Sequence, residues 1–557
     1  MPKQQFHLMT PVFGAAIVMY GGMGSIALAE SRIPASSELS FAGISESNRF
    51  IPKKALMAIS IPTDGKAWSQ LERFHTPKTK RIFDREVAAF LRTGFPKNDY
   101  AKEIQPWLGN VTMAILPNSI GSQPKTESKY HFILVTEVKD LAAVAKYLDK
   151  EKVRDGGRVV AQKNYKGIEI VQIDREYGSS FVYALADRFL VLSDRVTALE
   201  QAIDTYKDGG SIVPALVTDK VEIENPIFQL YMPNFAESIQ QIDAQSTDPT
   251  ELPPQFLAQL KKVKSVNLGV GIDSAGIRTK VTSRLTSDLA WEFQPAPGKV
   301  VAQLPFDTFA LVTGSNISDR WRQFNRDVQS FPELKSLLDT ARQGLQSFPL
   351  QLDLDKDIFG WMDGEFAFGA IPVKEGILGE FGTAPIFIQQ TSDRRTANLL
   401  FQKVEKLASG YGLVTIATRN IKGVSVTQWT LPGAPEPIVS YGWYANNTLF
   451  VTIGEQLVRR MTNRYNEPLT LNSDFQAAIA SLSKPNLGYF YLDMDKTWAA
   501  IDKYLPKETK SEINPEVNAI LGRIRGLGVT VSMSSPSTHK LEMLLSLKPR
   551  GLRNVWY

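Results

Sequence analysis

A phrase built around a tryptophan occurs twice in this chain and limits the folds that the chain can adopt. "KEIQPWLGNVTMAI" spans residues 102–115, and "KDIFGWMDGEFAFGA" spans residues 356–370. Each phrase has a charged pair, an Ile, a Trp and a Gly, followed by apolar residues at the alternating period of a β-strand. The two tryptophans, Trp107 and Trp361, lie 254 positions apart. This repetition predicts two units that each use the phrase once.

Further landmarks recur in the same order at nearly the same distance. An expected strand and turn precede Trp68 in "ALMAISIPTDGKAWSQLERF" and Trp321 in "TFALVTGSNISDRWRQF", and these tryptophans lie 253 positions apart. "YKGIEIVQI" and "IKGVSVTQW" contain Gly167 and Gly423, which lie 256 positions apart. Spacing that drifts so slowly along the chain predicts an internal duplication, with the paired tryptophans and glycines as structural equivalents.

Length and pattern together predict the fold class. A chain of 557 residues is too long for one hydrophobic core and is expected to divide into domains. Expected hairpins outnumber regular strand–helix–strand alternation, so we predict an α+β fold of two tandem, internally duplicated units with mainly antiparallel sheets and packed helices. The predicted division is residues 51–290 for the first repeat unit, 291–303 for a linker containing Pro and Gly, and 304–550 for the second repeat unit.

The tryptophans of the repeated phrase have two interpretations. Burying a tryptophan removes a large apolar area from water, which favours a core position for Trp107 and Trp361. Stacking against a ligand is the alternative for the same two side chains. Both interpretations predict that the two residues play the same part in the two units.

The N-terminal segment predicts export. Residues 1–29 contain an apolar stretch that ends in the tripeptide "ALA". Small residues at Ala27 and Ala29 are those that a signal peptidase accepts, so cleavage after Ala29 is predicted. An uncleaved membrane anchor is the alternative, because about 20 apolar residues can span a bilayer. Residues 30–50 are expected to be a polar lead-in to the first unit.

Little in the chain predicts catalysis or a cofactor. Cysteine is absent, which excludes disulfides and thiolate chemistry, and the four histidines show no metal-ligand spacing. The best metal candidate is "DLDKD", where Asp353, Asp355 and Asp357 alternate as at the start of a calcium loop. The match then fails, because Ile358 and Gly364 stand where that loop has a Gly and a bidentate Glu. A solvated turn is therefore favoured over a calcium or magnesium site, and no catalytic or cofactor-binding residue is predicted.

Several of these phrases also carry a family resemblance. "FIPKKALMAIS", "DYAKEIQPWLGNVTMAI", "YKGIEI" and "ALADRFLVLSDRVTALEQAI" resemble the cyanobacterial proteins grouped as domain-of-unknown-function family 3352. The resemblance extends over nearly the whole chain after the N-terminal segment. It implies an envelope or thylakoid protein, exported to the periplasm or the thylakoid lumen or anchored there, and it implies no activity and no catalytic residues.

Charge and composition bound the choice of partner. A net charge of +5 over this length is weak, and no dense basic footprint is present, so nucleic acid is excluded as a partner. The 10% aromatic content suits protein interfaces. We therefore predict a non-catalytic interaction, assembly or scaffold protein with a protein partner. A carrier of a lipid or other apolar ligand at a membrane surface is the alternative, and a hydrolase with an unrecognised site is the weaker third reading.

Overall fold

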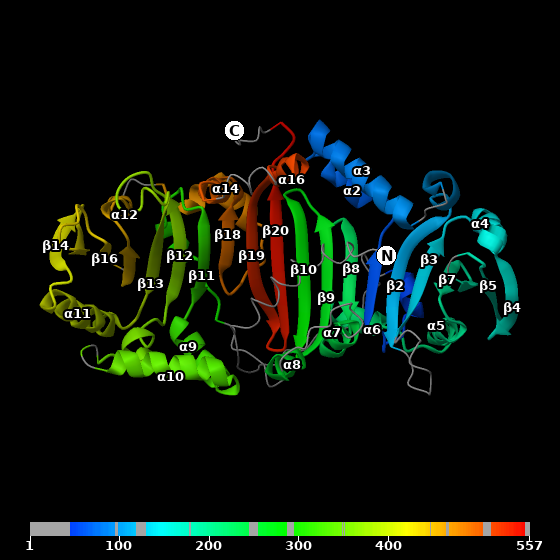
Figure 1. The fold of residues 1–557 in the computed structure, drawn as a ribbon, viewed down its shortest axis with the longest axis horizontal. Helices are drawn as coiled ribbons and strands as arrows, with labels where there is room; N and C mark the ends of the chain where they lie inside the picture. The colour runs from blue at the N-terminus through cyan, green and yellow to red at the C-terminus, as the bar shows by residue number, and fades with distance from the viewer. Residues whose placement is uncertain are drawn as a thin grey trace.

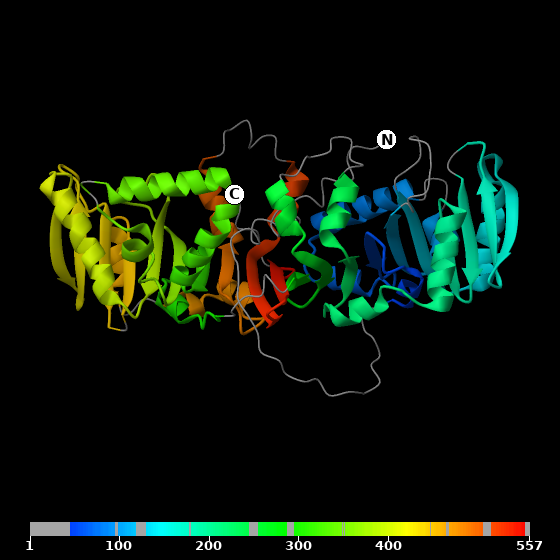
Figure 2. The same cartoon turned by 90° about the horizontal axis from the view of Figure 1, so that it is seen from below.

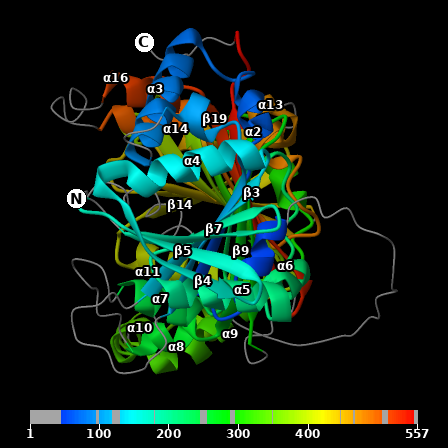
Figure 3. The same cartoon turned by 90° about the vertical axis from the view of Figure 1, so that its right-hand side faces the viewer.

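The computed structural model describes residues 45–551 apart from 95–98, 118–129, 178–179, 244–253, 287–293, 348, 350, 446, 464–466 and 505–513. These residues form an elongated molecule in which a single sheet of twenty strands runs along the long axis (Figure 1). Helices lie on both sides of the sheet (Figure 2, Figure 3). The predicted combination of helices with a large antiparallel sheet is confirmed.

The described residues of the first half supply ten of these strands. Their bounds are β1 (Met57–Ile61), β2 (Leu108–Pro117), β3 (Tyr130–Val138), β4 (Arg158–Tyr165), β5 (Ile168–Asp174), β6 (Phe181–Ala186), β7 (Phe189–Ser193), β8 (Pro226–Met232), β9 (Val263–Ile272) and β10 (Gly276–Leu285). They pair, all antiparallel, in the order β4–β5–β6–β7–β3–β2–β1–β8–β9–β10.

The second half supplies the other ten. Their bounds are β11 (Ala310–Ser315), β12 (Glu365–Pro372), β13 (Thr383–Gln390), β14 (Thr415–Ile421), β15 (Val424–Thr430), β16 (Val439–Tyr444), β17 (Thr448–Thr452), β18 (Tyr489–Asp493), β19 (Ile524–Ser535) and β20 (Thr538–Leu547). They pair in the order β14–β15–β16–β17–β13–β12–β11–β18–β19–β20. This is the order of the first half with each strand number raised by ten.

The two halves meet where β10 pairs with β20. The pairing is antiparallel and runs from Gly276 opposite Ser546 to Arg284 opposite Thr538. We expected sheets belonging to separate units, and the structure instead joins them into one. The physical reason is that β10 and β20 would otherwise be exposed edge strands with unpaired backbone groups, and pairing them satisfies both edges.

Helices of the two halves also correspond in order. The first half has α2 (Lys66–Leu71), α3 (Pro77–Gly94), α4 (Leu141–Val153), α5 (Val196–Asp208), α6 (Val213–Thr218), α7 (Phe235–Asp243) and α8 (Pro254–Leu260), with short helices η1 (Glu46–Phe50), η2 (Tyr100–Ile104) and η3 (Arg154–Gly156). The second half has α9 (Ile317–Asp327), α10 (Pro332–Gln346), α11 (Arg394–Gly410), α12 (Glu455–Met461), α13 (Ser473–Ile479), α14 (Met494–Asp502) and α16 (Pro515–Leu521), with η5 (Lys299–Gln303), η6 (Val328–Ser330), η7 (Leu354–Ile358) and η8 (Leu469–Leu471). In Figure 1, α3 and α10 lie at opposite edges of the molecule.

One face of the sheet carries the main cores. In the first half, Ala58, Ala114 and Ile133 pack with residues of η1, α5 and α6. The corresponding core of the second half is built from residues of β11, β12, β13, β15, β17, β18 and β20 and from η5, α12 and α13. Thus η1, at the end of the predicted lead-in, and η5, at the end of the predicted linker, both belong to packed cores. Alternation along a strand sends these side chains to one face together.

The repeated phrase forms a single π-helical turn in each half. Asp99 caps η2 by accepting a hydrogen bond from the Lys102 N–H, and Asp353 caps η7 in the same way. The indole Nε1 of Trp107 then donates to the Glu103 carbonyl at 2.7 Å, and that of Trp361 donates to the carbonyl four residues before it at 3.1 Å. The phrase therefore builds a capped turn that places its tryptophan under the following strand.

The paired glycines occupy the same hairpin turn. Lys166 and Gly167 join β4 to β5 with φ of 50° and 80°, and Lys422 and Gly423 join β14 to β15 with φ of 52° and 85°. Two consecutive positive φ values are those of a type I′ turn, which suits the twist of a hairpin. Glycine at the second position adopts this conformation without a steric penalty.

Candidate interaction surface

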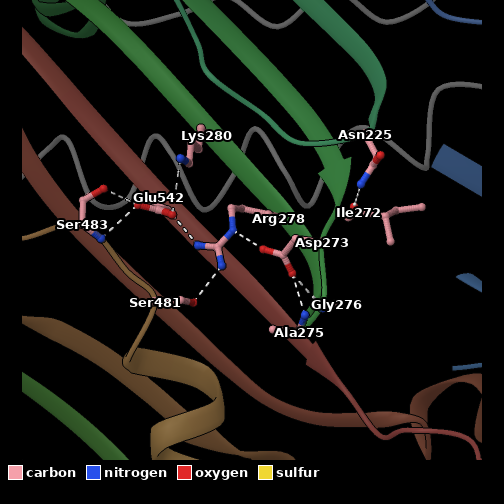
Figure 4. A network of polar contacts seen from close by, with 10 residues as sticks. All are labelled: Asn225, Ile272, Asp273, Ala275, Gly276, Arg278, Lys280, Ser481, Ser483 and Glu542. Atoms are coloured by element: carbon pink, nitrogen blue, oxygen red, sulfur yellow. Dashed lines mark hydrogen bonds and ion pairs between the residues drawn. The ribbon is translucent and has the colours of Figure 1, made fainter. Parts of the chain in front are cut away.

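A buried network of charged groups ties the halves together at the seam (Figure 4). The guanidinium of Arg278 on β10 donates to Asp273 at 2.5 Å, to Glu542 on β20, and to the Ser481 hydroxyl at 2.8 Å. The second oxygen of Glu542 accepts from the Ser483 N–H at 3.0 Å and from its hydroxyl at 2.5 Å. Arg278 therefore pairs with one carboxylate of its own half, Asp273, and with one across the boundary, Glu542.

The seam fixes how the two halves are oriented. Asp273 also caps the turn between β9 and β10 by accepting from the N–H groups of Ala275 at 2.8 Å and Gly276 at 3.0 Å. A buried charge that loses its partner costs about 3–5 kcal/mol, so the network resists rearrangement of the β10–β20 pairing. The parts of any surface that spans both halves therefore keep a constant position relative to each other.

The face of the sheet opposite the main cores carries apolar side chains that are exposed or only partly buried. Ile59, Met113 and Leu134 are direct cross-strand neighbours on β1, β2 and β3, so they point to one face. Phe132 lies two residues from Leu134 on the same face. Met113 is 37% exposed and Phe132 43% exposed. We name these four residues the first patch.

The second half carries a matching set on β11, β12 and β13. Val312, Phe368 and Phe387 are cross-strand neighbours there. Phe368 stacks on Phe387 with ring centroids 4.5 Å apart and meets Phe366 edge-on at 6.0 Å. Val312 is 44% exposed and Phe368 51% exposed. We name Val312, Phe366, Phe368 and Phe387 the second patch.

Each patch lies between parts of the same face that helices cover, and Ile59 at the margin of the first patch is partly buried against one of these parts. On one side of the first patch, α7 and α8 pack over β8 and β9. On the other side, α4 and Trp107 pack over strands β5 to β7. In the second half, α11 and Trp361 cover β16 and β17, and α14 lies over β18 and β19. Contiguous exposed apolar surface of this kind marks interaction sites in soluble proteins.

The structure gives the residues singled out in the sequence different surroundings. Trp107 and Trp361 are both buried. Trp321 stacks on Phe359 at 4.0 Å, whereas Trp68 is exposed beside Phe83 at 5.4 Å. Ala27 and Ala29, the predicted cleavage positions, lie outside the described residues.

The three aspartates of the metal candidate point to separate partners. Asp353 caps η7, and Asp357 accepts from the Asp353 N–H at 2.9 Å. Asp355 accepts from the Trp321 indole at 2.5 Å and from Arg342 at 3.1 Å. Burial acts to raise the pKa of Asp355, but hydrogen bonds from Arg342 and Trp321 outweigh it, so the pKa lies below its ordinary value. Within the part of the chain that the structure describes, no three acidic or histidine side chains gather as metal ligands do.

The patches and the seam network were missed in the sequence. One signal for the second patch was available, because "EFAFGA" places aromatic residues at alternate positions while the intervening Ala367 is also apolar. Apolar residues at successive positions of a strand show that both of its faces avoid water. They do not show which of the two faces a helix covers. Glu542 lies 264 positions after Arg278, and the nearby Asp273 carries no motif that would link the two.

Comparisons with known proteins give a family and little beyond it. A profile of the family described as "Protein of unknown function (DUF3352)" matches residues 12–547. No curated protein matches. Two crystal forms of TP0453 are similar to this chain at 13% and 11% identity, both with TM-scores near 0.25 (0.25 and 0.26). They cover 42% and 44% of this chain and 79% and 81% of their own.

None of the described helices combines the length and the apolarity that crossing a membrane requires.

Proposed function

We propose that this chain, which belongs to the DUF3352 family, is a non-catalytic binding protein that docks a protein partner on its two apolar patches. The observation that supports the proposal is the matched pair of exposed cross-strand ladders. Ile59 and Met113 in one half correspond in strand pairing to Val312 and Phe368 in the other. Apolar and aromatic side chains placed together on a rigid sheet are typical of the centre of a protein interface.

The exposure of the patches favours docking over lipid carriage. A carrier encloses most of its ligand in a pocket, whereas Met113, Phe132, Val312 and Phe368 each expose more than a third of their surface. Surfaces this open suit a partner that brings its own apolar face. Lipid binding on the same patches remains the alternative that the experiment below separates.

Two equivalent patches on one rigid body would bind a partner at two points. The repeated strand order supports an origin of the halves by duplication, and we include that origin in the proposal. The continuous β10–β20 pairing holds the two patches at a constant separation. Engagement of both patches by one partner or by two linked copies raises the overall affinity without a new contact, provided that the geometry matches.

Location is part of the proposal and is supported by the N-terminal sequence. The apolar segment ending at Ala29 supports export across an inner or thylakoid membrane, with cleavage or anchoring as the two outcomes. The proposed setting is therefore the periplasm or thylakoid lumen of a cyanobacterium. Mass spectrometry of the mature N-terminus decides between cleavage and anchoring.

The test is affinity purification of tagged protein from its native membranes in mild detergent, with mass spectrometry of proteins and lipids. The patch variant combines Phe132→Ser and Phe368→Ser. The matched control is Phe381→Ser, which removes an exposed phenylalanine that lies outside both patches. A partner that wild type and control retain, and that the patch variant loses at unchanged thermal midpoint, is the expected result.

Two outcomes would contradict the proposal. A stoichiometric partner retained by the patch variant places the binding surface elsewhere on the molecule. A lipid that co-purifies with wild type without any protein, and is lost with the patch variant, makes the protein a carrier.

A further inference from the structure

The joined sheet has one edge strand at each end of the molecule. Among the described residues, β4 pairs only with β5, and β14 pairs only with β15. The two strands hold the same place in the repeated order and lie at opposite ends of the long axis (Figure 1). An edge strand leaves the backbone N–H and C=O groups of its outer side without a strand partner, and another strand can bind them.

The edge strand of the first half carries two features that block such pairing. The register of β4 against β5 shifts between Val159 and Ala161, which leaves Val160 as an extra residue in the edge. Lys163 adds a charged side chain to the same strand, where it forms an ion pair with Glu200. Bulges and lysines are devices by which natural sheets keep their edge strands from pairing.

The edge strand of the second half has neither feature. The register of β14 against β15 is unbroken from Thr415, which lies opposite Thr430, to Ile421, which lies opposite Val424. The sequence of β14 contains no lysine and no proline, and its one charged residue is Arg419. The same place in the repeated order is therefore protected in the first half and open to a further strand in the second.

The turn that follows β14 decides which backbone groups point outward. Lys422 and Gly423 form a two-residue type I′ turn. The residues that flank such a turn, here Ile421 and Val424, form a hydrogen-bonded pair. Hydrogen-bonded and non-hydrogen-bonded pairs alternate along an antiparallel ladder, so every second residue turns its N–H and C=O groups away from β15. The residues with outward groups are Ile416, Thr418 and Asn420.

This outer edge is complementary to a second copy of itself. In an antiparallel pairing on a two-fold axis through Thr418, that residue lies opposite its own copy. Ile416 then lies opposite Asn420, and Ala417 lies opposite Arg419. No like charges meet in this register, and a pair of threonines is favourable across a sheet. The three residues with outward groups meet one another, so each pair exchanges two hydrogen bonds.

Exposed apolar side chains gather beside the start of this strand. Tyr411 and Leu413 precede β14 and are 58% and 59% exposed. Leu431 follows the end of β15, which pairs with the start of β14, and is 44% exposed. Continued by two residues, the same register brings Leu413 beside Gly423 in the turn of the other copy. Apolar surface next to an open edge adds the buried area that a stable interface needs beyond strand pairing.

The chain already contains one contact of this kind, because β10 and β20 are repeat-equivalent strands that pair antiparallel to join the halves. We propose that β14 pairs antiparallel with β14 of a second copy of this chain, centred on Thr418, and so forms a homodimer with one continuous sheet. Closed two-fold dimers are the commonest oligomers of soluble proteins. Strands β15, β16 and β17 separate this contact from the second patch, so it is independent of the docking proposed above.

Sedimentation equilibrium of the purified chain measures the dimer, which is expected in wild type at about 10 μM. Thr418 is exposed, so it accepts a charged residue without loss of the fold. Thr418→Lys places two lysines opposite each other and should raise the dissociation constant of the dimer at least about tenfold, and Thr418→Glu should do the same. An equimolar mixture of the two variants should dimerise again, because a lysine then lies opposite a glutamate.

The matched control is Gln162→Lys on β4. Gln162 lies three residues before the turn-flanking Tyr165, as Thr418 lies three residues before Ile421. This variant adds the same charge to the protected edge, so it should leave the dissociation constant unchanged. The thermal midpoint of each variant, measured alongside, should equal that of wild type.

Four results would overturn the proposal. Wild type that remains a monomer at about 100 μM does not form the dimer. A dimer that Thr418→Lys leaves intact uses another surface. Failure of the mixed variants to dimerise excludes a two-fold register centred on Thr418. Assembly that Gln162→Lys abolishes uses β4, as a head-to-tail chain of copies would.

Discussion

The two halves share one arrangement of strands but fill it differently. Both build a capped π-turn, a buried tryptophan and a type I′ hairpin turn from matching phrases. The first half closes its core with the stacked rings of Phe50 and Tyr206. Gln303 takes the place of Phe50 in the second half, because the carbonyls of the residues that follow them accept equivalent backbone hydrogen bonds, Ile51 from Ile212 and Leu304 from Leu469. The difference shows that the same strand order tolerates a change of core filling.

The strongest test of the likeness uses the two tryptophans. Trp107→Ala and Trp361→Ala should each lower the free energy of unfolding by about 3–5 kcal/mol, because each removes a buried indole and its hydrogen bond to the chain. Urea unfolding followed by circular dichroism measures both. A loss in one variant alone would break the equivalence, and near-native stability in both would move the residues from structure towards ligand binding.

The next test concerns the difference in core filling. Phe50→Ala should cost about 3–4 kcal/mol, because it leaves a cavity beside Tyr206 and Phe189. Gln303→Ala at the equivalent position should change the free energy of unfolding by less than about 1 kcal/mol, because Gln303 is only partly buried. The two variants are compared by thermal and urea unfolding. Equal losses would mean that Gln303 is packed as tightly as Phe50.

A third test compares two residues at the seam between the halves, where Lys280 on β10 lies opposite Glu542 on β20. Glu542→Leu should cost about 3 kcal/mol, because Arg278 loses a buried partner. Lys280→Met should cost under about 1 kcal/mol, because the Lys280 ammonium is partly exposed and lies 3.8 Å from the carboxylate. Unfolding in urea measures both. A small effect of Glu542→Leu would show that strand pairing alone joins the halves.

The smallest expected effect depends on pH. His539 stands three residues before Glu542 on β20, where β10 has Ile277 three residues before Lys280. Burial lowers the pKa of His539 to about 4, and a hydrogen bond to the Pro536 carbonyl opposes this only in part. The unfolded chain therefore takes up a proton first, so stability is complete above pH 6.5 and is lost as the pH falls towards 4.

Between pH 7 and pH 5 this histidine should lower the free energy of unfolding by about 2 kcal/mol. Urea unfolding at the two pH values measures the loss. His539→Ile, which copies the residue of β10, should remove most of it. His75, whose pKa is also lowered chiefly by burial, is replaced by Gln in the control. A loss that persists unchanged in His539→Ile would assign the pH dependence to other groups.

Parts of this protein follow from local sequence. The charged pair, Ile and Trp of the repeated phrase predict a turn that leads into a strand, and η2 and η7 are such turns. Gly167 and Gly423, expected to be equivalent, lie in matching hairpins. These features depend on residues close in the chain, whose conformational preferences act before any distant contact forms.

Other parts depend on which segments meet. The role of Asp353 as a helix cap is local, but the partners of Asp355 come from α9 and α10 and carry no spacing signal. The exposed patches depend on where α4, α7 and α8 stop covering the sheet. Hydrophobic periodicity reports which residues avoid water on average, and it does not report whether a helix is present above them.

By itself the sequence determined the α+β class, the repeated turn with its tryptophan and the hairpin glycines, because these arise from near neighbours and from strand alternation. Only the tertiary structure decided that β10 and β20 merge the halves into one sheet, that Met113 and Phe368 remain exposed, and that Gln303 stands where the first half has Phe50. The reason is that strand pairing, helix coverage and core filling are set by contacts between residues hundreds of positions apart, which no local pattern records.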